Sequence, residues 1–136
     1  MTGSVRQIKA LQKDIKKYID SINYGGCVHF AYYFSKKLSY LGIKNHVVFL
    51  DKSDPIKISY KDFDGVDHAM VFIPNIGYID GLRIVKDFRE LNYRYIKSKI
   101  PLTKLDNFRN MEDIWCSDYD TEQNFLLQDL INEHIR

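Results

Sequence analysis

The chain has 136 residues, of which 45% are hydrophobic and 14% aromatic, so it can bury a core of its own. Its 20 Lys and Arg residues nearly balance its 18 Asp and Glu residues, which argues against a nucleic-acid partner or an anionic membrane surface. No apolar run is long enough to cross a bilayer, and the first residues resemble a polar helix rather than an export signal. We therefore expect a single domain over residues 1–136 that stays in the cytoplasm.

Two helices are predicted at the start of the chain. Residues 4–22 place apolar side chains at helical spacing on one face and lysines on the other. The pair Gly25-Gly26 breaks this pattern, and residues 27–41 then keep a three-to-four spacing up to Gly42, a residue typical of helix ends. Cys27 is the first residue of the second predicted helix, where backbone N–H groups and the helix dipole favour a thiolate.

After Gly42 the hydrophobic period becomes that of strands. Strands are predicted over residues 45–50, 68–73 and 76–80, with 57–60 as a candidate short strand and 62–65 as a turn. The Pro74-Asn75 turn joins the last two strands in a hairpin. Helices followed by an antiparallel meander indicate the α+β class.

The second half of the chain is less regular. Residues 84–96 mix aromatic and charged side chains without a single period, which fits either a helix or an irregular strand. Residues 101–119 are predicted as loop with short helical turns. Residues 122–135 are predicted as a final helix, with Asp120 or Thr121 as its N-cap.

Cys27, His68 and Asp80 are the candidate catalytic residues. A free thiol has a pKa of about 8.5 and is mostly protonated at neutral pH, so a nucleophilic cysteine needs a base. The predicted hairpin brings His68 and Asp80 onto neighbouring strands, where a carboxylate can orient an imidazole. The glycine pair lets a substrate carbonyl approach the Cys27 backbone N–H, which can donate to an oxyanion. This pattern predicts cysteine acyl transfer without a metal or cofactor.

The order and spacing of five motifs resemble the transglutaminase-like branch of the papain-like cysteine peptidase superfamily. They cover about residues 20–82 and are Gly25-Gly26-Cys27-Val28-His29-Phe30-Ala31, Leu41-Gly42-Ile43, Val47-Val48, His68-Ala69-Met70-Val71 and Gly77-Tyr78-Ile79-Asp80. The resemblance implies a papain-like fold (the transglutaminase core), with N-terminal helices packed on an antiparallel sheet. It implies Cys27 as nucleophile, His68 as general base and then acid, and Asp80 as the orienting group.

The resemblance also implies an activity: acyl transfer from the amide of a peptide, an isopeptide or a Gln side chain. Superfamily members usually carry a polar oxyanion-binding side chain before the cysteine, and Asn23 is the candidate, with Tyr24 as an alternative. The chain has no room for accessory β-domains and no acidic cluster for calcium. It therefore resembles a microbial hydrolase acting on a peptide, protein or cell-wall amide, such as a phage or cell-wall peptidase, or a toxin-like deamidase. Abundant Ile, Lys, Asn, Asp and Tyr also fit a phage or viral origin.

Other interpretations stay open. The fold could be catalytically silent and serve as a binding or structural module. Cys116 is expected to pack beside Trp115, since a disulfide with Cys27 would silence the nucleophile. The remaining histidines are expected to be structural or on the surface, because a zinc site of Cys27, His29, Cys116 and His134 has no recognised ligand spacing. Substrate identity and oligomeric state are not predicted.

Overall fold

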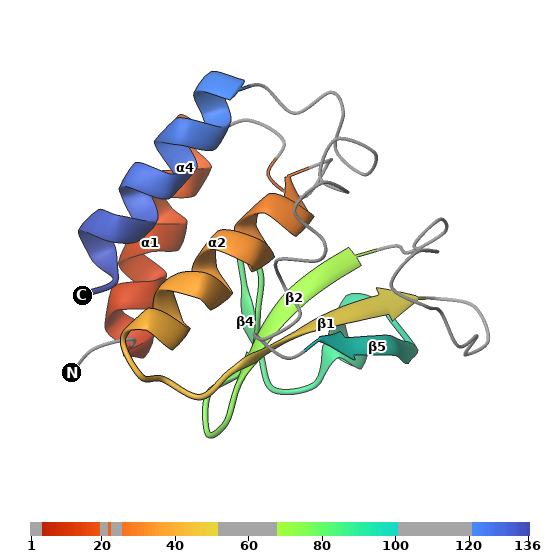
Figure 1. Ribbon diagram of the computed structural model, residues 1–136. Coiled ribbons are helices and arrows are strands. Elements are labelled where there is room, and N and C mark those ends of the chain that lie inside the picture. The colour runs from red at the N-terminus through yellow and green to blue at the C-terminus, as the bar shows by residue number, and fades with distance from the viewer. Residues whose placement is uncertain (1–3, 20–21, 23–25, 52–67, 101–120) are drawn as a thin grey trace.

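The structure is a computed structural model that describes residues 4–19, 22, 26–51, 68–100 and 121–136. In these residues, helices α1 (Val5–Tyr18), α2 (Cys27–Tyr40) and α4 (Thr121–His134) gather on one side of an antiparallel sheet (Figure 1). This arrangement confirms the predicted α+β class.

The first helix is shorter than predicted. Ser4 caps α1 by accepting a hydrogen bond from the Gln7 backbone N–H, and the helix ends at Tyr18 because Ile19 has an extended backbone. Ile19 and Ile22 are nevertheless buried, at 4% and 2% exposure. Both residues lie outside α1 and yet continue its apolar pattern, which is why the spacing wrongly predicted a helix to residue 22.

The second helix agrees with the prediction over residues 27–41. It ends where Gly42 takes a positive φ of 79° and the Ile43 N–H donates to the Leu38 carbonyl at 2.9 Å. This hydrogen bond closes a Schellman motif, in which a glycine adopts the left-handed conformation without steric cost.

Within the described ranges, the sheet has five strands in the order β4-β3-β2-β1-β5, and all neighbours are antiparallel. Three strands follow the prediction: β1 (His46–Asp51), β2 (His68–Ile73) and β3 (Gly77–Ile79). Strands β2 and β3 form the predicted hairpin, with Val71 opposite Ile79. The two edge strands are β4 (Ile84–Val85) and β5 (Tyr95–Ile100).

Each face of the sheet buries its own set of side chains. The face toward the helices contributes Val47, Phe49, Ala69, Val71, Ile73 and Ile79 to the main core. The opposite face carries Val48, Leu50 and Met70, and partly buried side chains from residues 85–93 pack against these three. The 3-10 helix η1 (Phe88–Leu91) belongs to this covering segment.

Residues 84–96 are therefore neither one helix nor one irregular strand. The chain passes from β4 through η1 into β5, so it changes conformation twice within this range. The predicted final helix is confirmed by α4, which packs beside α1. Predictions for residues 57–60, 62–65 and 101–119 and for Asp120 lie outside the described residues. Among the helices described here, none is long and apolar enough to span a membrane.

Candidate active site

Three elements bring the candidate catalytic residues to one end of the sheet. Cys27 is half-buried at the first position of α2, His68 is the first residue of β2, and Asp80 follows β3 directly. The N-terminal end of α2 lies beside the start of β2 (Figure 1). Residues far apart in the sequence thus meet at a helix N-terminus, where backbone N–H groups favour negative charge.

His68 and Asp80 form a buried pair. The imidazole Nε2 lies 3.0 Å from the Asp80 Oδ2, and the exposed fractions of the two side chains are 2% and 0%. The hairpin accounts for this contact, because its antiparallel register brings the start of β2 beside the residues that follow β3. Local strand pairing therefore assembles two of the three candidate residues.

Several donors converge on the Asp80 carboxylate. Its Oδ1 accepts hydrogen bonds from the Leu82 and Arg83 backbone N–H groups, both at 2.8 Å, and the Arg83 guanidinium lies 3.4 Å from its Oδ2. Burial alone raises the pKa of Asp80, but the hydrogen bonds from His68 and Leu82 and the nearby positive charges outweigh it. The net effect lowers the pKa below its ordinary value, so this buried carboxylate is ionised at neutral pH.

The environment of His68 favours the charged imidazolium. Burial lowers the pKa of His68, yet hydrogen bonds to Asp80 and Cys27, with the charges of both groups, raise the pKa to about 9. Because Nε2 faces Asp80, the ring nitrogen available to the Cys27 sulfur is Nδ1. His68 is thus the group that interacts electrostatically with both the thiol of Cys27 and the carboxylate of Asp80.

A buried glutamine from α1 holds the turn that carries Asp80. The Gln12 side chain is only 8% exposed, and its Nε2 donates to the backbone carbonyls of Asp80 and Arg83 at 2.9 and 2.8 Å. This role of Gln12 was not predicted from the sequence. The sequence did contain a feature that could have indicated this role, because the polar Gln12 interrupts the apolar helix face formed by its neighbours Leu11 and Ile15.

Two further contacts confine the site. Tyr93 stacks on the His68 imidazole with ring centroids 5.2 Å apart and planes tilted by 9°. Gly81 lies so close to Ile22 that a Cβ at this position would approach the Ile22 side chain to 2.6 Å. Any larger residue directly after Asp80 would therefore have to displace the buried Ile22 side chain. Nothing in the mixed pattern of residues 84–96 singled out Tyr93.

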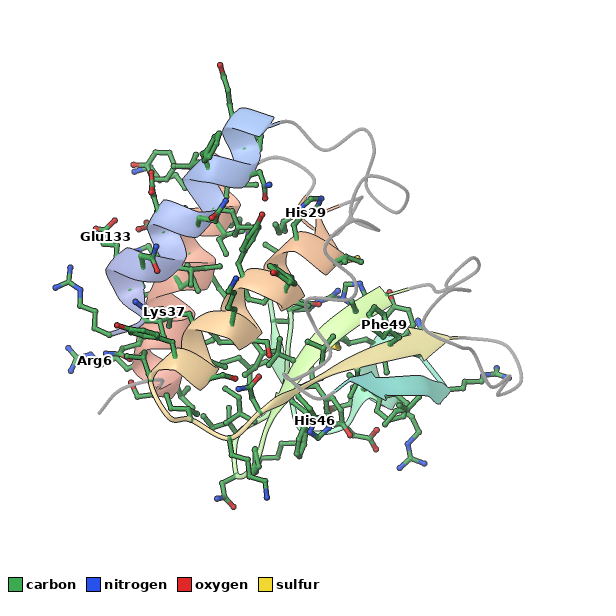
Figure 2. All side chains as sticks on the ribbon, viewed as in Figure 1. Arg6, His29, Lys37, His46, Phe49 and Glu133 are labelled. Carbon is green, nitrogen blue, oxygen red and sulfur yellow. The ribbon has the colours of Figure 1, made fainter. Side chains whose placement is uncertain are left out.

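The remaining histidines lie away from this pair. Figure 2 shows His29 at the start of α2 and His46 at the opposite end of the sheet. His46 contacts the Phe72 ring, and His134 lies 2.6 Å from an Asp14 carboxylate oxygen. Asn23, Tyr24 and Cys116 are outside the described residues. Within the part of the chain that is described, no group of three His, Cys, Asp or Glu side chains could hold a metal ion.

The raised pKa of His68 predicts a pH-dependent stability. The imidazolium has a pKa of about 9 in the folded protein and an ordinary value of 6.5, so protonation favours folding. This contribution is complete below pH 6.5 and is lost as the pH rises toward 9. We expect the free energy of unfolding, measured by urea titration, to fall over this range and to fall less in His68→Gln. Equal slopes for the two proteins would contradict the assigned pair.

Comparison of the chain with protein-family models, curated proteins and solved structures found no match.

Proposed function

We propose that the protein is a cysteine-dependent amide hydrolase or acyltransferase with a transglutaminase-like, papain-like fold. The observation that supports it most is that one buried imidazole pairs with the Asp80 carboxylate at 3.0 Å and has a pKa that is raised by both Asp80 and the Cys27 thiol. A thiol at a helix N-terminus, a base and an orienting carboxylate are the groups that nucleophilic catalysis by cysteine requires.

The first half of the proposed reaction acylates Cys27. The Cys27 thiolate attacks the amide carbonyl carbon, a C–S bond forms, and the carbonyl oxygen becomes an oxyanion. As this intermediate collapses, the C–N bond breaks and the His68 imidazolium gives its Nδ1 proton to the leaving amine. The products are a thioester at Cys27, a neutral imidazole and a free amine. Asp80 keeps the imidazole oriented throughout.

The second half releases the acyl group. A water molecule or an amine attacks the thioester carbonyl and gives its proton to His68, and the C–S bond then breaks. This step yields a carboxylic acid or a new amide and restores the thiolate–imidazolium pair. The choice between hydrolysis and transfer depends on which nucleophile reaches the thioester.

The start of α2 offers donors for the oxyanion. Gly26 occupies the N-cap position, and because it has no side chain, no side-chain oxygen of that residue covers the first turn. The Cys27 backbone N–H belongs to this turn and can donate to the developing negative charge. We propose Asn23 as a second donor.

Alkylation of Cys27 tests the activated pair. In a Cys116→Ser background, we expect iodoacetamide at pH 6 to modify Cys27 roughly tenfold or more faster than a free cysteine, because the N-terminus of α2 and the His68 imidazolium favour the attacking thiolate. His68→Ala should bring the rate close to that of the free thiol. Intact mass would follow the modification, and rates would be measured from pH 5 to 10.

His46→Ala is the matched control. It removes an imidazole at the other end of the sheet and should leave the alkylation rate unchanged. If alkylation of Cys27 is slow and its rate is the same in His68→Ala, the proposed enzyme activity is rejected. That result would favour a catalytically silent binding or structural module. Fast alkylation dependent on His68 would justify a screen of peptide, isopeptide and glutamine amides for a thioester adduct.

A further inference from the structure

A basic groove lies between α1 and the turn that follows Asp80. It has a volume of about 410 Å³, and besides Gln12 it is lined by Lys9, Lys13, Lys16, Leu82, Arg83 and Ile84. The described lining residues include four cations and no carboxylate. This groove adjoins the candidate active site, because Gln12 and Arg83 both contact Asp80.

Arg83 pairs with the Asp80 carboxylate at 3.4 Å, but the three lysines of the groove have no such counter-charge in the described chain. No ion pair joins Lys9, Lys13 or Lys16 to a carboxylate among the described residues. The only acidic residue of α1, Asp14, lies 2.6 Å from His134 of α4 instead. Three exposed lysines therefore face one hollow without an internal counter-charge, which favours an anionic occupant.

We propose that the basic groove binds an acidic peptide segment of a partner protein in an extended conformation. Lys9 and Lys13 are separated by about 6 Å of helix rise, at ~1.5 Å per residue. An extended peptide places alternate side chains about 7 Å apart on the same face. Two acidic residues with one residue between them would therefore match these two lysines.

The groove walls favour a peptide over a nucleic acid. Leu82, which is 40% exposed, and Ile84 give the hollow an aliphatic side that can contact a peptide's apolar atoms. Its described lining contains no aromatic ring on which a base could stack. Binding at this groove requires no chemistry at Cys27, so the binding proposal can be tested independently of the proposed enzyme activity.

Fluorescence anisotropy with the full-length protein tests the groove directly. The probe is a fluorescein-labelled octapeptide of alternating Glu and Ser, measured at about 50 mM salt, where charge screening is weak. Replacing Lys9, Lys13 and Lys16 by Gln should weaken binding about tenfold, the effect of three exposed ion pairs. The amide NMR signals of Leu82 to Ile84 should shift when this peptide is added.

The matched control replaces Lys17, Lys36 and Lys44 by Gln. These lysines are exposed and lie outside the groove, so this variant has the same net charge and should bind within about twofold of wild type. Equal weakening in both variants would show diffuse attraction and overturn the proposal. It would also be overturned by no binding of the Glu peptide, by equal binding of a Gln–Ser peptide, or by tighter binding of an oligothymidine.

Discussion

Replacing Asp80 by alanine should lower the free energy of unfolding by about 3 to 5 kcal/mol, because it leaves a buried charge without its partner. The carboxylate accepts hydrogen bonds from two backbone N–H groups and pairs with the His68 imidazole, which is only 2% exposed. Alanine offers none of these groups an acceptor. Urea unfolding followed by circular dichroism at pH 7 would measure the loss.

Asp80→Asn separates the charge from the hydrogen bonds. The two backbone N–H groups at 2.8 Å should hold the amide oxygen, which turns the NH₂ group toward the Nε2 of His68. That nitrogen must then accept a hydrogen bond rather than donate one, so the Nδ1 that faces Cys27 carries the proton in neutral imidazole. We expect Asn to preserve more stability than Ala and yet to slow the alkylation of Cys27.

The exposed carboxylate of Asp87 provides the comparison for Asp80. It pairs with Arg89 at the surface, and Asp87→Asn should change stability little. If Asp80→Ala unfolds at the same urea concentration as Asp87→Asn, the buried pair does not stabilise the fold in the way we infer.

Gln12→Met should destabilise the protein by about 1 to 3 kcal/mol, because it removes two buried hydrogen bonds. The Asp80 carbonyl loses the Gln12 donor, whereas the Arg83 carbonyl still accepts a hydrogen bond from the Asp80 backbone N–H at 3.1 Å. Methionine keeps the approximate length and shape of glutamine but cannot donate to the carbonyls of Asp80 and Arg83. The loosened turn should also slow the alkylation of Cys27 through His68, which makes Gln12 a positioning residue. Both effects can be measured in the same preparations.

Gln128→Met is the matched substitution for Gln12→Met. Its side chain makes a longer hydrogen bond, 3.5 Å, to a carbonyl within its own helix and should contribute little. If Gln12→Met and Gln128→Met have the same stability, the link from α1 to the turn after Asp80 is not a significant support of the site.

The contacts between α1 and the turn after Asp80 show that the geometry of the candidate site depends on packing against the helices. Gln12 and Asp80 are 68 residues apart, yet one amide nitrogen joins the helix to the turn. Ile22 packs against Gly81 from the segment that follows α1. The geometry of the imidazole–carboxylate pair thus depends on an element that carries none of the three candidate catalytic residues.

Much of the local structure could be predicted from the sequence. The period of apolar residues identified α2 and α4, and Gly42 marked the end of α2 because its positive φ suits glycine. The Pro74-Asn75 turn between two apolar runs identified the β2–β3 hairpin, and with it the proximity of His68 and Asp80. These are short-range features, so nearby residues are sufficient to specify them.

Other features depend on contacts between distant segments, and only the tertiary structure decided them. Tyr93 stacks on His68 and Gln12 supports Asp80 because separate elements pack together, and β5 joins the sheet beside β1. Residues 84–96 had no single period because they pass from one sheet edge, across the buried face, to the other edge. Local propensity cannot specify such a path, since each part of it responds to a different neighbouring surface.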